Sequence, residues 1–330
     1  MLKLIAIAAA AILPVAVFAQ SPVVIKFSHV VATDTPKGKG AEAFRKCGEE
    51  RAKGRVQIEV YPNSTLYKDG EELSALQLGA VQMLAPSLAK FGPLGVKEFE
   101  VFDLPYIFDS YEDLHKVTDG PIGASLMKKL ESKGILGLAY WDNGFKDMSA
   151  NKALRMPEDV RGLKMRIQSS KVLDTQMRAL GGVPQVMAFS EVYQALQTGV
   201  VDGTENPPSN LYTQKMHEVQ KYLTLSNHGY VGYAVITNRN FWMGLPPELR
   251  ATLEACMQEA TKVANDNAKK DNEDAIEAVR KSGRTQIITL TPQEKAAWKK
   301  ALVKVHQQSE DRIPRDLMLS IYKETGFKPE

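Results

Sequence analysis

The chain has 330 residues, of which 44% are hydrophobic and 25% charged, and its formal net charge at pH 7 is +3. These values are ordinary for a globular protein, and the length suits one large domain or two medium ones. Because positive and negative residues are mixed along the sequence rather than gathered in blocks, nucleic acid is not an expected partner.

The amino terminus has the pattern of an export signal. Lys3 precedes a mostly apolar run at 4–17, and Val17-Phe18-Ala19 has the small-x-small pattern that signal peptidase recognises. We therefore predict a signal peptide at 1–19, cleavage before Gln20, and a mature protein that works in the periplasm. A membrane anchor is the alternative, but it would need about 20 apolar residues.

The next predicted elements form a β-α-β-α-β order that occurs twice. Alternating apolar residues and glycine turns predict the first set, with strands at 23–27, 56–61 and 81–85 and helices at about 39–53 and 70–79. The second set has strands at 163–167, 183–187 and 201–205 and helices at 170–180 and 190–198. The heptapeptides ALQLGAV at 75–81 and ALQTGVV at 195–201 hold equivalent places in these two sets. We infer a duplication that built two similar lobes.

Two segments are predicted to connect the lobes. A strand at 135–140 leads into Trp141-Asp142-Asn143-Gly144, which has the composition of a turn, and 230–238 begins rich in glycine and ends as a strand. A helix at about 247–281, roughly 50 Å long at 1.5 Å per residue, can run across both lobes. A last strand at 285–290 precedes a helix-capping box, Thr291-Pro292-Gln293-Glu294.

These elements predict an α/β fold of the periplasmic-binding-protein kind, in which each lobe is a β-α-β-based sheet flanked by helices. We expect the first lobe to contain 20–143 plus about 232–272, and the second lobe to contain 144–231 plus about 273–330. Cys47 and Cys256 are the only cysteines. They could pair in an exported protein, but we expect two buried thiols.

The sequence lacks the common signatures of catalysis and cofactor binding. It contains no HExxH, GxSxG or GxxxxGK motif, and its five histidines have no metal-ligand spacing. Residues 38–43 fit a loose dinucleotide-binding pattern, but the loop before them is too long for that motif. We predict no cofactor, no metal and no catalysis. An exported hydrolase or lyase that uses Glu205 or His29, and a sensor domain, remain the alternatives.

The strongest candidate for a binding residue is Arg166. Ligands of open α/β sheets collect beyond the carboxyl ends of parallel strands, where Arg166 and Gln168 end one predicted strand and Asn206 follows another. A guanidinium offers two parallel donors that match a carboxylate, and an amide can add a third. The competing interpretation is that Arg166 forms a structural ion pair with Glu205 or Asp202.

Four further candidates have an equally plain structural explanation. His29 ends the first strand and could be a packed histidine, whereas Lys37 lies in a polar loop and could be solvated. Trp141 and Phe189 are predicted near the lobe junction, where an aromatic side chain more often belongs to the core than to a ligand site.

Several stretches resemble the solute-binding subunits of tripartite ATP-independent periplasmic (TRAP) transporters, in the DctP-type dicarboxylate-binding branch. The stretches that carry the resemblance occur in order along the predicted mature chain: FSHVVA at 27–32, TPKG at 35–38, LPY at 104–106, GLKMR at 162–166, MAFSEVYQALQ at 187–197, VDGTENP at 201–207 and HEVQKYL at 217–223.

The resemblance implies a two-lobed protein that closes on an organic acid and presents it to a TRAP membrane permease. It implies that Arg166 grips the ligand carboxylate, that Asn206 assists it and that Phe189 lines the pocket. Lys146 occupies the place of a second arginine found in sialic-acid binders of the family, which makes a nine-carbon sugar acid less expected.

With His29, Lys37 and Lys146 as further cations, the branch implies a four-carbon dicarboxylate such as malate, succinate or fumarate. A keto, aromatic or sugar acid is the alternative ligand. We expect the protein to act as a monomer.

Overall fold

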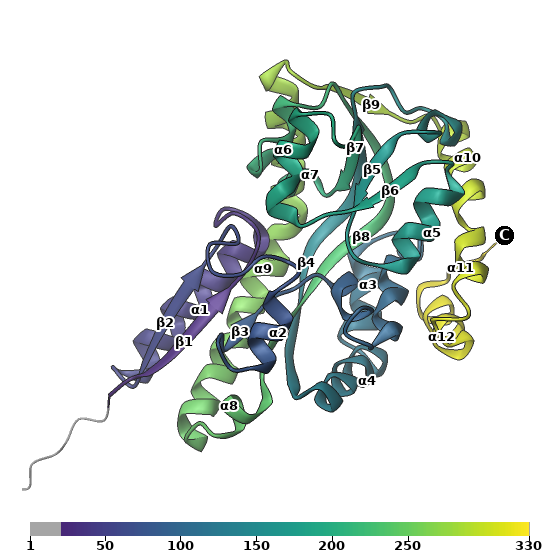
Figure 1. Cartoon of the computed structure of the whole chain (residues 1–330). Helices are drawn as coiled ribbons and strands as arrows, with labels where there is room; N and C mark the ends of the chain where they lie inside the picture. Colours follow the sequence, from purple (N-terminus) through teal and green to yellow (C-terminus); the bar gives the residue numbers. More distant parts are fainter. Residues whose placement is uncertain (1–20, 330) are drawn as a thin grey trace, which may run out of the picture.

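The computed structural model describes residues 21–329 (Figure 1), so the predicted signal peptide and its cleavage site before Gln20 lie outside the described residues. Within the described part, none of the helices combines the length and the apolar composition that crossing a membrane requires.

Between residues 21 and 329, nine strands form one sheet in the order β2-β1-β3-β8-β4-β7-β5-β6, with β9 paired to β8. The strands are β1 (Val23–Ser28), β2 (Val56–Tyr61), β3 (Met83–Leu84), β4 (Ile135–Ala150), β5 (Lys164–Ile167), β6 (Val183–Val186), β7 (Gly203–Asn206), β8 (Tyr222–Asn238) and β9 (Gln286–Thr289). The two longest strands, β4 and β8, lie side by side at the centre of this order.

The pairing of the strands repeats in the two halves of the sheet. β1 lies parallel to both β2 and β3, and β5 lies parallel to both β6 and β7. β3 then pairs antiparallel with β8, just as β7 pairs antiparallel with β4. Gly79 and Gly199, which end the two equivalent helices, both have a left-handed backbone with φ of 76° and 72°. The predicted repeat of a β-α-β-α-β order in the two halves is therefore confirmed.

Helices cover both halves of this sheet (Figure 1). The α-helices are α1 (Pro36–Ala52), α2 (Glu72–Gln77), α3 (Tyr111–Thr118), α4 (Pro121–Lys129), α5 (Lys171–Ala179), α6 (Val192–Gln197), α7 (Pro208–Thr213), α8 (Arg239–Met243), α9 (Pro247–Ser282), α10 (Pro292–Leu302), α11 (Lys304–Gln308) and α12 (Arg315–Thr325). The 3₁₀ helices are η1 (Leu88–Phe91), η2 (Lys97–Asp103), η3 (Leu130–Lys133), η4 (Pro157–Val160), η5 (Phe189–Glu191) and η6 (Met216–Glu218).

Helix α1 begins three residues before the position we predicted. Thr35 caps it by accepting the backbone N–H of Gly38, and Pro36 fits the first turn because that turn needs no N–H from it. A Cβ on Gly38 would lie 2.4 Å from the carbonyl oxygen of Thr33, so glycine permits this close approach. As a result Lys37 belongs to the first turn of a helix instead of a solvated loop.

The predicted turn at 141–144 is wrong, because β4 runs through these residues without turning back. β4 pairs with β8 from Ile135 opposite Asn238 to Ala150 opposite Tyr222, with register shifts at three places, one of them between Asp142 and Gly144. A bulge adds one unpaired residue to a strand and bends it. The strand therefore continues through Asn143 and Gly144 without a turn.

The long helix is confirmed as α9, which contacts both α1 in the first half and α7 in the second. Cys47 on α1 and Cys256 on α9 form a disulfide with their Cα atoms 5.6 Å apart. Our expectation of two free thiols was wrong, since the packing of α1 on α9 brings both sulfurs into bonding distance. The capping box of α10 is confirmed, with Thr291 and Glu294 bonding reciprocally.

Candidate ligand-binding site

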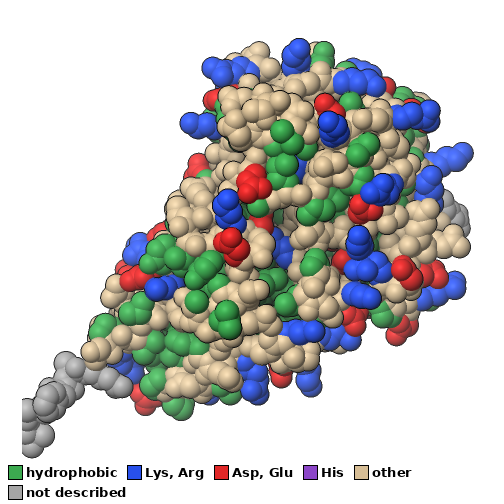
Figure 2. Space-filling model, viewed as in Figure 1, with side chains coloured by type: hydrophobic (Ala, Val, Ile, Leu, Met, Phe, Trp, Pro, Cys, Tyr) green, Lys and Arg blue, Asp and Glu red, His purple; other side chains and the backbone are tan. Residues whose placement is uncertain are grey.

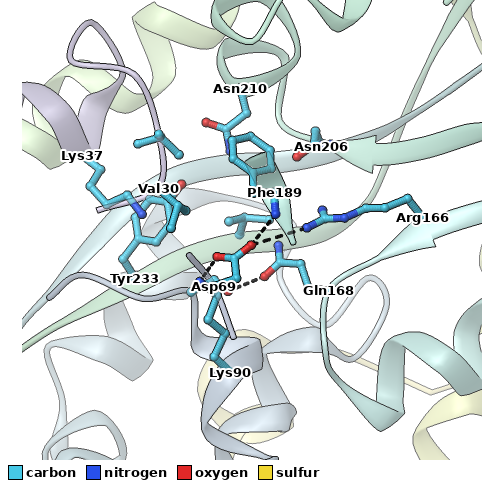
Figure 3. A pocket seen from close by; sticks show the side chains of 13 residues that line it. Val30, Lys37, Asp69, Lys90, Arg166, Gln168, Phe189, Asn206, Asn210 and Tyr233 are labelled. Atoms are coloured by element: carbon cyan, nitrogen blue, oxygen red, sulfur yellow. Dashed lines mark hydrogen bonds and ion pairs between the residues drawn. The ribbon is translucent and has the colours of Figure 1, made fainter. Parts of the chain in front are cut away.

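A small pocket lies between the two halves of the sheet (Figure 3), with side chains of both halves in its lining. The first half and its connections supply Val30, Val31, Lys37, Asp69, Ser87 and Lys90, β8 supplies Val231 and Tyr233, and the second half supplies Arg166, Gln168, Phe189, Asn206 and Asn210. Arg166, Gln168 and Asn206, which were predicted at the ends of two strands, therefore line one pocket together with residues of the first half.

Arg166 lies near the end of β5 with its side chain only 2% exposed. Its Nε and Nη2 atoms donate to the backbone carbonyl of Met187 at 3.1 and 2.9 Å, which fixes the plane of the guanidinium. Its Nη1 has no partner in the described structure, although the group lines the pocket. A buried N–H group without an acceptor costs free energy. Nη1 of Arg166 is therefore suited to donate to an oxygen of a bound ligand.

The structural ion pairs that we considered for Arg166 do not form. Glu205 instead accepts hydrogen bonds from Lys146 and Gln176 at 2.7 and 2.8 Å, and its other close neighbour is His228 at 2.7 Å. Burial alone would raise the pKa of Glu205, but Lys146 and His228 hold it well below its usual value. Glu205 is therefore ionised, and its negative charge is already paired with Lys146.

Lys37 approaches the pocket from the side opposite Arg166 (Figure 3). Its ammonium donates to the carbonyl of Ala85 at 2.9 Å and lies 3.7 Å from the centre of the Tyr233 ring. Burial, followed by the positive charge of Lys90, lowers the pKa of Lys37 to about 7. A buried ammonium held by a carbonyl and a ring, with no carboxylate in bonding contact, is a natural receptor for an anion.

The third cation, Lys90 on η1, is matched by two acids of the protein. It donates to Asp69 and, at 2.6 Å, to Glu72, so the two carboxylates keep the pKa of Lys90 above its usual value even though burial would lower it. Burial likewise opposes the ionisation of Asp69, but Lys90 and then Arg166 hold the pKa of Asp69 at about 2. This corner of the pocket therefore carries its own counter-charges.

Three further predicted residues line the pocket beside Arg166. The ring centre of Phe189 lies 5.7 Å from the guanidinium carbon, and Gln168 accepts a hydrogen bond from the hydroxyl of Ser87 in the other half. The amide nitrogen of Asn206 donates to the hydroxyl of Thr204 at 3.1 Å. The same nitrogen also donates to the sulfur of Met216 at 3.8 Å, so the amide is held by two neighbours of the second half.

Three predicted site residues lie outside the pocket lining. Trp141 is fully buried in the core of the first half, where its ring centre lies 6.0 Å from that of Phe27. Lys146 is committed to Glu205, and His29 is fully buried with neither ring nitrogen bonded. Burial, followed by Lys37, lowers the pKa of His29 to about 3, so this imidazole is neutral and supplies no charge.

The sequence prediction missed Asp69, Lys90, Asn210 and Tyr233. Tyr233 lies within the predicted crossover at 230–238, and that prediction could have pointed to it. Asp69 is related to Phe189 by the same offset of 120 residues that relates the two heptapeptides, which is a second available signal. Nothing in the sequence around Lys90 marks it, because its position depends on how η1 packs.

Across residues 21–329 no cluster of three or more His, Cys, Asp or Glu side chains is placed to hold a metal ion. Figure 2 shows basic and acidic side chains interspersed over the face in view, as the sequence pattern predicts.

Comparison with known proteins agrees with this geometry. Residues 27–312 match the profile of the DctP family, described as bacterial extracellular solute-binding protein, family 7. The C4-dicarboxylate-binding periplasmic protein DctP of Rhodobacter capsulatus is 65% identical over 305 residues, which are 92% of each chain.

Two solved structures are similar over most of this chain. A TRAP periplasmic solute-binding protein of Sulfurospirillum deleyianum with bound succinate has a TM-score of 0.89 and 48% identity over 92% of this chain and 99% of its own. Its counterpart from Pseudomonas aeruginosa with bound L-malate has a TM-score of 0.85 and 44% identity over 87% of this chain and 100% of its own. These TM-scores show that the α/β fold with a central sheet is shared with both.

Proposed function

Because this chain belongs to the DctP family, family 7 of the bacterial extracellular solute-binding proteins, we propose that it binds a four-carbon dicarboxylate, such as succinate, fumarate or malate, between its two lobes. The bound acid is then delivered to a TRAP membrane permease. The names and ligands of the relatives support this assignment, and the charges that line the pocket support it independently.

The observation that carries the proposal is a pair of cations, Arg166 and Lys37, that donate no hydrogen bond to a protein carboxylate. Asp69 lies 4.0 Å from Nη2 of Arg166, on the side away from its free Nη1. Lys90 already has Asp69 and Glu72, so Arg166 and Lys37 are the two positive groups available to a ligand. Arg166 has a free Nη1 and Lys37 has only a carbonyl and a ring as partners. Two receptors on opposite sides of one small pocket suit an acid with a carboxylate at each end.

The space between the two receptors favours a short, mostly apolar backbone. Val30, Val31 and Val231 line the pocket together with Phe189, and valine side chains offer no hydrogen bonds to sugar hydroxyls. A polyhydroxylated acid would leave its hydroxyl groups unbonded against these residues, which costs free energy. Ser87, Gln168, Asn206, Asn210 and Tyr233 add polar groups to the lining, so the preference for a four-carbon diacid over a sugar acid rests on the two cations together with the valines.

We place the hinge of the two lobes in the central strands β4 and β8 and in helix α9, with the boundaries given in the sequence analysis. Lobe closure buries the ligand carboxylate against Arg166, where the lower dielectric strengthens the pairing. Ligand binding and closure therefore stabilise each other.

A thermal-shift screen followed by isothermal titration tests the ligand. Succinate, fumarate and malate should raise the melting temperature, because a ligand that binds only the folded state stabilises it. Butyrate is the matched control, since it has the same number of carbons but one carboxylate. A shift with butyrate as large as that with succinate would contradict the proposal, and a larger shift with a keto, aromatic or sugar acid would identify the alternative ligand.

The remaining parts of the proposal concern location and partners. We propose that the protein acts in the periplasm as a monomer and releases its ligand chemically unchanged. Mass spectrometry of succinate, fumarate and malate after incubation with the protein distinguishes this from the exported-enzyme alternative. Light scattering with and without ligand measures the oligomeric state.

A further inference from the structure

Two equivalent turns of the duplicated lobes meet face to face at the pocket. The turn at 68–71 precedes α2 and the turn at 188–191 precedes α6, an offset of 120 residues. Asp69 of the first turn accepts the backbone N–H of Phe189 of the second, its counterpart by the same offset. Lys68 lies 3.3 Å from Glu191 across the same gap. The duplication thus places a carboxylate opposite a backbone donor at the boundary between the lobes.

Asp69 is held in place from its own lobe. Lys90, from η1 of the first half, donates to the carboxylate oxygen that does not face Phe189 (Figure 3). Arg166 of the second half lies 4.0 Å from the oxygen that does, and the Asp69 side chain is 13% exposed. Asp69 therefore makes one ion pair within its lobe and two interactions that exist only while the lobes are together.

Asp69 also separates two cavities. The pocket described above and a neighbouring hollow, lined on its other side by Gly70, Ser169 and residues 186–188, share Asp69, Lys90, Arg166 and Gln168. These four side chains form the partition between them.

From this arrangement we propose that Asp69 is an interlobe latch, whose hydrogen bond to the Phe189 N–H holds the pocket shut and sets the rate of ligand release. The latch rests on the proposed function, because it governs the release of the same ligand. Asp69 is a positioning residue in this scheme, since it acts on the second lobe and not on the ligand. A hydrogen bond to a charged group is stronger than a neutral one, which suits a carboxylate to this role.

Stopped-flow measurement of succinate release tests the latch. Asp69→Ala should raise the dissociation rate about 10-fold to 100-fold, the range for a lost hydrogen bond to a charged group. Asp69→Asn keeps an acceptor of the same shape but loses the charge, so its rate should fall between those of Asp69→Ala and the wild type. The association rate should not decrease, because both variants remove a negative charge beside Arg166.

Lys68→Met is the matched control, since it breaks the exposed pair of the same turn with Glu191 and should change release by about twofold or less. A dissociation rate that is unchanged or slower in Asp69→Ala would overturn the latch, and a slower rate would show that Asp69 chiefly repels the ligand.

A second measurement does not depend on the ligand. Gln57→Cys on β2 and Lys164→Cys on β5 introduce cysteines at exposed positions, one in each lobe. Nitroxide labels on these cysteines report the distance between the lobes by pulsed electron paramagnetic resonance. The native cysteines are joined and do not take label. Asp69→Ala should reduce the closed fraction without ligand, and an unchanged fraction would count against the latch. A wild-type protein that binds none of succinate, fumarate and malate would refute the proposed function instead.

Discussion

The two halves of the molecule follow the same β-α-β-α-β path but present different chemistry to the ligand. Their equivalent framework residues are nearly interchangeable: Leu76 and Leu196 are both buried, as are Val81 and Val201. The ligand-facing residues differ, since the second half offers Arg166 from a strand and the first offers Lys37 from the first turn of a helix.

This difference teaches where a duplicated fold is free to change. Leu76 and Leu196 are constrained by the close packing of the core, in which the loss of even one methylene group is felt. Arg166 and Lys37 are also buried, but they lie at a strand end and in the first turn of a helix and line the pocket, where a different side chain changes what the ligand meets. The two halves therefore differ in the cations that they present to the ligand, while the residues of their cores remain alike.

Removing the receptor of the second half should have the largest effect on binding. Arg166→Ala should weaken dicarboxylate binding by about 2 to 5 kcal/mol, because it removes one partner of a buried charge pair. Arg166→Lys is the conservative control and should recover part of the loss, since it restores the charge but not the fork. Isothermal titration with succinate measures both, and an unchanged affinity in Arg166→Ala would contradict the assigned role.

Breaking the disulfide should affect the framework of the first half and leave the site intact. Cys47→Ser with Cys256→Ser should lower the free energy of unfolding by about 2 to 4 kcal/mol, as is usual for a lost crosslink. Thermal unfolding measures this loss, and titration should show dicarboxylate affinity close to that of the wild type. A large loss of affinity would mean that the disulfide shapes the pocket as well.

The receptor of the first half should make binding depend on pH. Burial and Lys90 lower the pKa of Lys37 to about 7, and a bound carboxylate would raise it, so binding takes up a proton above that pH. Affinity should therefore be greatest below about pH 7 and fall at higher pH by up to about tenfold per unit, or about 1.4 kcal/mol. Titrations between pH 6 and 9 test this, and Lys37→Met should bind more weakly but lose the dependence.

The two helix-ending glycines should respond alike and weakly. Gly79→Ala and Gly199→Ala each place a side chain at positive φ but meet no atom within 4 Å, so only the backbone strain is introduced. Each should destabilise the protein by about 1 to 2 kcal/mol. Thermal unfolding of the two variants compares the halves directly, and clearly unequal losses would show that the equivalence of these turns is superficial.

Most of the fold and half of the site were accessible from the sequence because they follow from local patterns. Arg166, Gln168, Phe189 and Asn206 come at or just after strands whose apolar alternation is plain, and the resemblance assigned them the same place. The sequence pointed to Lys37 as a candidate but did not predict that it is buried, because the predicted helix began after Lys37 and not at Pro36.

The remaining residues depend on features that a local pattern does not carry. Trp141 and Lys146 lie on β4, where successive bulges change which face each side chain takes, so alternation does not tell pocket from core. His29 is buried by the packing of the first half. Asp69 and Lys90 come from a turn and a short 3₁₀ helix whose positions are set by tertiary contacts alone.

The disulfide has a consequence for how the molecule is assembled. Its two sulfurs are 209 residues apart in the chain, although both belong to the framework of the first half. In a polypeptide that crosses a membrane amino terminus first, oxidation must wait until more than three-quarters of the length has emerged. With export as proposed, the first half would begin to fold early but be crosslinked only after the whole second half at 144–231 has crossed the membrane.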